Sequence, residues 1–359
     1  MQLDMHYYGT YAMARAAGLK KEVCRVIATA AQFVDDNAEK GSVEFRDGGR
    51  LDVEATAHHA FNIKNIDRAD QRQIWVPFHF LPGNEGAGYT QRLTCIKDSE
   101  IAREMIDFNL SLLDQSYAIP LIGITAHVYA DTFSHYGFSG VSSRENKVSD
   151  IRHYDVEPDM EKYITDKAKD FKNNYPESGL FQNIKSWFAE GLSGALGHGA
   201  VMTYPDRPYL KWDFIYETTE QRCTMRNNSE TFLECCLKLH EMFQRVAREG
   251  NNLSDSNAFI DFSQIEPVIK RILNVQAPEQ GRIDAWLNAA KEGELFGIGP
   301  EDIPLYNQHI WHNHRENLKR EKDSRKAPAV PVFRYYQAAA IHRTNILRHL
   351  LPEKELIVA

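Results

Sequence analysis

Cysteine is scarce in this 359-residue chain, and its five residues follow no metal-binding spacing. They are Cys24, Cys95, Cys223, Cys235 and Cys236. The number is odd, and no pair has the CxxC spacing of a zinc or redox motif. This scarcity argues against a disulfide framework and against a cysteine zinc site, and it fits a reducing compartment.

Long apolar runs and a recognisable export signal are also missing. No run reaches the ~18 apolar residues that a transmembrane helix needs, so we expect no membrane span. The first segment, MQLDMHYYGTYAMARAAG, carries an acid at Asp4 and has neither a basic region nor a long apolar core. It therefore does not resemble a secretory signal. We expect a cytoplasmic protein.

An excess of positive charge is the third absence. Lysine and arginine number 42 against 50 acidic residues, which gives a net charge of −8. This balance argues against a broad nucleic-acid surface, and it is compatible with a small-molecule or lipid-type phosphoester substrate held by metals. The GxSxG elbow, the P-loop, the dinucleotide-binding GxGxxG context and HExxH are absent as well. The sequence does not indicate an oligomeric state.

The composition is that of an ordinary globular protein, and its apolar periodicity is mostly helical. We expect helices over 9–31, 98–114, 117–136, 158–173, 181–203, 213–249, 262–274, 279–291, 301–324 and 332–350. Alternation around the Asp47-Gly48-Gly49 turn predicts a β-hairpin over 42–56. Pro77 favours an extended segment over 74–81, and residues 141–156 are expected to form a polar connection.

The predicted fold is mainly α, a multi-helix, bundle-like domain with a metal site between helices and a small β-hairpin. Residues 1–250 would form the helical metal-binding core. Residues 251–359 would form a C-terminal helical extension packed on that core, unless the two parts make one continuous domain.

The most informative stretch is ITAHVYADTFSHYGFSG, residues 124–140. On a helix, His127, Asp131 and His135 follow one another at four-residue spacing and share one stripe. The surrounding residues are apolar, and a buried ionisable stripe is costly unless it is paired or binds a metal. Because residues eight apart are separated by about 12 Å along a helix, two metals with Asp131 between them are the simpler arrangement. A core histidine pair hydrogen-bonded to Asp131 is the alternative.

Earlier in the chain, five further residues are candidate ligands. His6 directly precedes the first predicted helix. Asp35 and Asp36 end that helix, where acids are unfavourable, so we expect one of them to bind metal. His58 and His59 follow the hairpin, and we expect one of the two to face inward.

Three more candidates follow. His79, in the apolar segment WVPFHFLPG, is expected to contact substrate, with aromatic packing as the alternative. His198 lies between Gly197 and Gly199, which allow close approach of a ligand or of another helix. Arg207 could hold a phosphate with its two-pronged guanidinium, although a surface salt bridge explains it equally well.

These motifs together resemble the zinc-dependent phospholipase C superfamily, whose relatives include the single-strand-specific zinc nucleases. The shared marks are an early His-Tyr, an Asp ending the first helix, and H-x3-D-x3-H in an apolar helix. The chain also looks like an uncharacterised bacterial family within or beside that group. The segments that carry this second likeness are HYYGTYAMARAAG, QFVDDN, WVPFHFLPG, HVYADTFSHYGFSG, GHGAVMTYPDRPYLKW and FRYYQAAAIHR.

The resemblance implies an all-α fold with a zinc cluster between helices. The implied ligands are His6, one of Asp35 and Asp36, one of His58 and His59, His127, Asp131, His135 and His198. Two departures reduce the expected number of metals. The superfamily uses an N-terminal tryptophan as a ligand where this chain has Met1, and an acid where this chain has Met202. We therefore expect one or two divalent ions, zinc first, with manganese or iron as alternatives.

The function expected from these features is that of a metal-dependent hydrolase, foremost a phosphoesterase acting on a phosphodiester or phospholipid-type substrate. A metal-activated water would be the nucleophile. Asp131 would bridge or orient the metals, and whichever of Asp35 and Asp36 is not a ligand would act as general base. The alternatives are a metal hydrolase acting on an ester or amide, and a non-enzymatic helical interaction protein with a structural metal.

Overall fold

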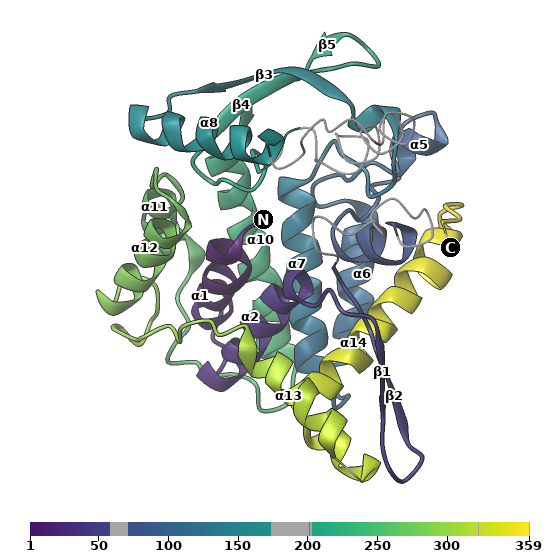
Figure 1. Cartoon of the computed structure of the whole chain (residues 1–359). Helices are drawn as coiled ribbons and strands as arrows, with labels where there is room; N and C mark the ends of the chain where they lie inside the picture. The colour runs from purple at the N-terminus through teal and green to yellow at the C-terminus, as the bar shows by residue number, and fades with distance from the viewer. Residues whose placement is uncertain (58–70, 174–200, 202, 322, 359) are drawn as a thin grey trace.

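The computed structural model describes residues 1–57, 71–173, 201, 203–321 and 323–358 (Figure 1). In this part of the chain the protein is mainly α, as predicted, and η marks 3-10 or π-helical segments. The helices before residue 180 are η1 (Asp4–Gly9), α1 (Thr10–Ala16), α2 (Lys21–Asp36), η3 (Gln71–Trp75), α4 (Val76–Phe78), α5 (Tyr89–Arg92), α6 (Glu100–Leu110), α7 (Ala118–Ser134), η4 (Arg144–Asn146) and α8 (Pro158–Asn173).

The helices after residue 200 complete the bundle. They are α10 (Asn228–Glu249), α11 (Phe262–Leu273), α12 (Glu279–Lys291), α13 (His309–Arg320), η6 (Ser324–Ala329), α14 (Pro331–Asn345), η7 (Ile346–Leu350) and α15 (Leu351–Glu353). Among the described helices, none is long and apolar enough to cross a lipid bilayer.

Helix α7 is the centre of the bundle. It packs against α2, α6, α10 and α14, and every residue from Pro120 to Ser134 is buried. A helix that is apolar on all sides needs neighbours on all sides, which explains this central place (Figure 1). One hydrophobic core runs from the N-terminal helices through α7 to α14 and η7, so residues of both predicted domains share it.

Two antiparallel sheets accompany the helices. The predicted hairpin is confirmed as β1 (Gly41–Glu44) paired with β2 (Arg50–Val53). The second sheet contains β3 (Val148–Tyr154), β4 (Lys211–Tyr216), β5 (Gln221–Arg222) and β6 (Arg226–Asn227). It lies with α8 at one end of the molecule and has its own small core, which includes Trp212 and Phe214 (Figure 1).

Several predicted boundaries were wrong. The helix expected over 9–31 is broken where Gly18 adopts a φ of +90°, so η1 and α1 are separate from α2. The segment 74–81 is helical at its start, because Pro77 lies in the first turn of α4, where its missing N–H costs nothing. The polar connection 141–156 contains β3, and the helix expected over 213–249 begins only at Asn228, after three strands. Helix α13 covers only the later part of 301–324.

The crossing of α2 and α7 depends on Gly123. A Cβ at this position would lie 2.4 Å from the carbonyl oxygen of Ile27 and 2.5 Å from the Cβ of Ala30. Both distances are far shorter than a real Cβ tolerates, so only glycine lets the two backbones approach this closely. The crossing sets the position of the end of α2, which carries Asp35, relative to α7, which carries Asp131.

We therefore predict that Gly123→Ala forces α2 away from α7 and lowers the free energy of unfolding by about 1–3 kcal/mol. Urea denaturation followed by circular dichroism measures this change. An unaltered midpoint in the Gly123→Ala protein would show that the crossing has more room than the structure indicates.

Candidate metal centre

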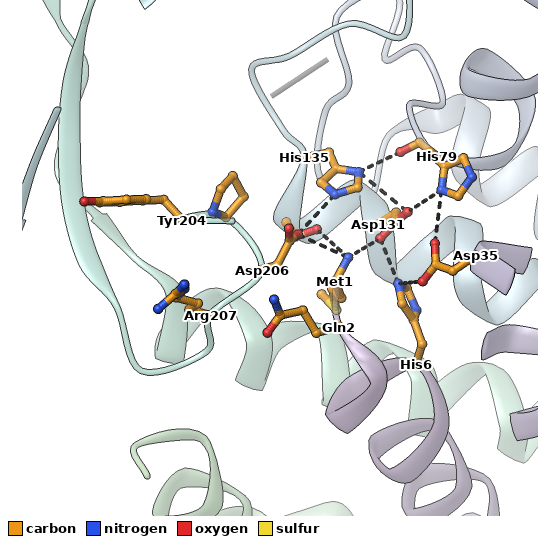
Figure 2. Close-up of polar contacts among 12 residues, drawn as sticks. Met1, Gln2, His6, Asp35, His79, Asp131, His135, Tyr204, Asp206 and Arg207 are labelled. Atoms are coloured by element: carbon orange, nitrogen blue, oxygen red, sulfur yellow. Dashed lines mark hydrogen bonds and ion pairs between the residues drawn. The ribbon is translucent and has the colours of Figure 1, made fainter. Parts of the chain in front are cut away.

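The carboxylate of Asp131, on α7, lies at the centre of a cluster of histidines (Figure 2). The residue is only 1% exposed. Its Oδ2 is 3.2 Å from Nε2 of His127 and 3.4 Å from Nδ1 of His79. Its Oδ1 is 3.2 Å from Nε2 of His6 and 2.7 Å from the amine of Met1. The two oxygens of one buried carboxylate thus face two different sets of nitrogen atoms.

Electrostatics keep this carboxylate charged. Burial opposes the ionised form of Asp131, but the His135 ring and the Met1 amine outweigh it and hold the pKa of the carboxyl well below its ordinary range. Burial, with the charges of His127 and Met1, lowers the pKa of His6 to about 4. At neutral pH the His6 ring is therefore uncharged and has a lone pair to offer a cation.

Asp35 joins the cluster from the last turn of α2. Its Oδ1 lies 3.7 Å from Nδ1 of His79 and 3.9 Å from Nε2 of His127, and its Oδ2 lies 3.9 Å from Nε2 of His6. Two groups of three residues place ligand atoms within 4.8 Å of one another. These groups are His6, His127 and Asp131, and Asp35, His79 and His127.

Hydrogen bonds outside the cluster orient two of the rings. Nε2 of His79 is 2.9 Å from the carbonyl oxygen of Thr56 and donates to it, so Nδ1 is the ring atom that faces Asp131. Nδ1 of His135 is 2.8 Å from the carbonyl oxygen of His79 and donates to it, which leaves Nε2 as the ligand atom. Histidines that bind metals typically have such a second bond to a carbonyl.

The cluster also contains buried polar atoms that the described chain does not satisfy. Both ring nitrogens of His6, Nδ1 of His127 and Oδ2 of Asp131 form no hydrogen bond with any described residue. A buried polar atom without a hydrogen bond costs roughly 1–3 kcal/mol, and for Nε2 of His6 and Oδ2 of Asp131 the ion-pair contacts described above offset part of this cost. Imidazole nitrogens and carboxylate oxygens are the donors that zinc and related divalent ions accept, so this donor set fits a cation.

A second set of contacts surrounds His135, the residue that ends α7. Its Nε2 is 3.3 Å from Oδ1 of Asp206, and the same oxygen is 3.3 Å from the Met1 amine. Burial opposes a charged amine, but Asp131 and Asp206 raise its pKa to about 11. His135 therefore lies between Asp206 and the His79 carbonyl, and its Nδ1 is 3.6 Å from Oδ2 of Asp131 (Figure 2).

Met1 and Asp206 are not among the site residues that the sequence predicts. Residue 1 has no ligand side chain where the resembled superfamily has tryptophan, yet its amine contacts two carboxylates. Asp206 has a weak signal in the sequence, since it is the first acid after His198 and lies in a proline-bounded turn. Nothing in the local pattern marks Met1, because its contact with Asp131 spans 130 residues.

The remaining candidates lie apart from the cluster or outside the described residues. Asp36 accepts hydrogen bonds from the hydroxyl of Tyr306 and from Gln32, and burial raises its pKa. The guanidinium of Arg207 donates to Thr203 and points away from Asp131 (Figure 2). The candidates outside the described residues are His58, His59 and His198.

Comparison with known proteins adds one finding. A family model, described as a family of unknown function (DUF6765), matches residues 1–350. The chain belongs to the DUF6765 family. No curated protein and no solved structure matches it. The resemblance to the zinc-dependent phospholipase C superfamily therefore stays a hypothesis, and the chemistry of the centre rests on its own side chains.

Adjacent acids on α2 provide a matched test of the centre. We predict that Asp35→Asn weakens zinc binding about 10- to 100-fold, because it removes a charged oxygen from the group containing His79 and His127. Asp36→Asn should leave zinc affinity within about threefold, because this carboxylate bonds Tyr306 instead. Competition with a chromophoric chelator measures both constants. Equal effects of the two substitutions would contradict the assignment of Asp35 to the centre.

Proposed function

We propose that this protein is a metal-dependent phosphoesterase that hydrolyses a phosphodiester or phospholipid-type substrate with a metal-activated water. The observation that carries the proposal is the placement of Asp131 between two groups of ligand atoms. A single carboxylate can bridge two cations about 3.5–4 Å apart, and such pairs are common in enzymes that cleave phosphoesters.

The two oxygens of Asp131 define the two proposed cation positions. On the Oδ2 side, Asp35, His79 and His127 would hold one ion. On the Oδ1 side, His6 would hold the other ion, in place of the charged Met1 amine that now pairs with this oxygen. Asp206 adjoins this second side through the Met1 amine. His135 contacts Asp206 through Nε2, whereas its Nδ1 lies nearer to Oδ2 of Asp131.

Divalent ions in these positions would supply two effects, a bound water with a pKa near 7 and polarisation of a phosphoryl oxygen. The chain's own residues would supply orientation, because the carbonyl oxygens of Thr56 and His79 fix the two rings that face Asp131. The cluster lies beside a pocket of about 860 Å³ whose wall includes Met1 and Asp35. Asp35 is therefore the proposed ligand side chain that a substrate in this pocket would meet.

The structure bears on the roles expected for Asp36 and Arg207. Asp36 lines the same pocket as Asp35, so it is the acid we propose as the proton acceptor. Arg207 is engaged by Thr203 and Tyr209, so we do not propose it as the group that holds the phosphate. A cytoplasmic location also remains part of the proposal, and the five free cysteines are consistent with a reducing compartment.

We predict metal-dependent hydrolysis of a generic phosphodiester substrate. Protein stripped with a chelator and reloaded with zinc or manganese should hydrolyse bis(p-nitrophenyl) phosphate, and the stripped protein should not. Asp131→Asn should lower kcat/KM by at least about 1,000-fold, because it removes the charge shared by both proposed ions. Asp107→Asn, at an exposed acid on α6, is the matched control and should retain full activity.

The same assay separates the alternative functions. Hydrolysis of p-nitrophenyl acetate without any phosphoester activity would replace the phosphoesterase with an esterase. Tight metal binding with no turnover of phosphodiester, phosphomonoester or ester would favour a structural metal in an interaction protein.

A further inference from the structure

The pocket beside the proposed metal centre is lined largely by polar side chains. It is bounded by the first residues of the chain, the end of α2, the start of α12 and the segment that leads into α13. Its polar walls include Gln2, Gln32, Asp36, Glu279, Tyr306 and Asn307. A volume of about 860 Å³ is that of a small-molecule site, so the pocket can hold more than the phosphoryl group itself.

The charge of the wall restricts what can occupy the pocket. Asp35, Asp36 and Glu279 contribute carboxylates, and the described wall residues include no lysine or arginine. Apart from the proposed metals, the only fixed positive charge in the described wall is the Met1 amine, which already pairs with Asp131 and Asp206. A second phosphate or a carboxylate on the substrate would therefore be repelled by these three acids. The part of the substrate that fills the pocket is therefore not anionic.

One wall residue carries an acceptor that the described chain leaves unused. Gln32 is only 7% exposed, and its Oε1 is buried without a hydrogen-bond partner among the described residues. Its Nε2 lies 3.4 Å from Oδ1 of Asp36, so the amide is held with Nε2 toward that acid. A buried carbonyl oxygen without a hydrogen bond favours binding of a ligand that donates a hydrogen bond to it.

Hydroxyl groups fit this wall better than ammonium groups do. The Asp36 carboxylate already accepts hydrogen bonds from Tyr306 and Gln32, so it is partly stabilised without a cation. The amide oxygens of Gln2 and Asn307 already accept from Arg282 and from the backbone N–H of His309, so their NH2 groups are what they can offer a ligand. Gln32 has an unused acceptor, and a hydroxyl group both accepts and donates. We propose that this pocket binds an uncharged, hydroxyl-rich alcohol portion of the substrate, a polyol esterified to the phosphate. This inference rests on the proposed phosphoesterase function.

A matched series of substrates tests the inference. The probes are methyl phosphodiesters of glycerol, of ethanolamine and of glyceric acid, which differ only in the group that would enter the pocket. With metal-loaded protein, kcat/KM for the glycerol ester should exceed both others by at least about tenfold. A preference for the ethanolamine ester would overturn the polyol assignment and indicate a cation pocket, and equal rates for all three would overturn it as well.

Gln32→Met provides the residue-level test. It keeps the volume of the side chain and removes the buried acceptor, so the ratio of kcat/KM for the glycerol ester to that for bis(p-nitrophenyl) phosphate should fall about tenfold. Gln280→Met, at an exposed glutamine on α12, is the control and should keep the wild-type ratio. An unchanged ratio in Gln32→Met would contradict the inference.

A binding measurement separates failure of this inference from failure of the proposed function. Glycerol 1-phosphate should bind metal-loaded protein at least about tenfold more tightly than inorganic phosphate, and Gln32→Met should abolish the difference. If no phosphoester is hydrolysed but this difference is found, the phosphoesterase proposal fails and the polyol pocket stands. If turnover is found without any difference in binding, the polyol pocket fails alone.

Discussion

The charged carboxylate of Asp131, buried in the middle of the bundle, is the group on which the rest of the site depends. A buried charge is tolerated only with compensating partners, and this one has them on both oxygens. The partners come from η1, α7 and the turn after α4, so one side chain joins segments that are far apart in the sequence. The same partners are nitrogen atoms that could bind a divalent ion in place of pairing with Asp131.

Two features of the backbone, the close approach of α2 to α7 and the break between α1 and α2, bring these side chains together. The close approach of α2 to α7 at Gly123 puts the end of α2 beside the buried stripe of α7. The break after α1 lets η1 and α1 lie separately from α2, so His6 and Asp35 enter the cluster from two different helices. His135 follows the last turn of α7, and its Nε2 faces Asp206 while its Nδ1 bonds the His79 carbonyl near Asp131.

The stripe of His127, Asp131 and His135 could be predicted from the sequence because four-residue spacing on an apolar helix is a local pattern. The helical class and the hairpin could be predicted for the same reason. The choice between Asp35 and Asp36 depended on the phase of α2 at its last turn, which periodicity does not fix. The contribution of Asp206 and the pairing of β3 with β4 could not be predicted, because both join residues more than 50 positions apart.

The central claim is that each oxygen of the Asp131 carboxylate binds a separate cation. Its most direct test is anomalous X-ray diffraction from crystals of the protein grown with zinc or manganese. We expect an ion bound to Oδ2 of Asp131 together with His79 and His127, and a second ion on the Oδ1 side near His6. An ion-free cluster at saturating metal, with Asp131 only hydrogen-bonded to histidines, would contradict it and leave a buried polar network at the centre of the bundle.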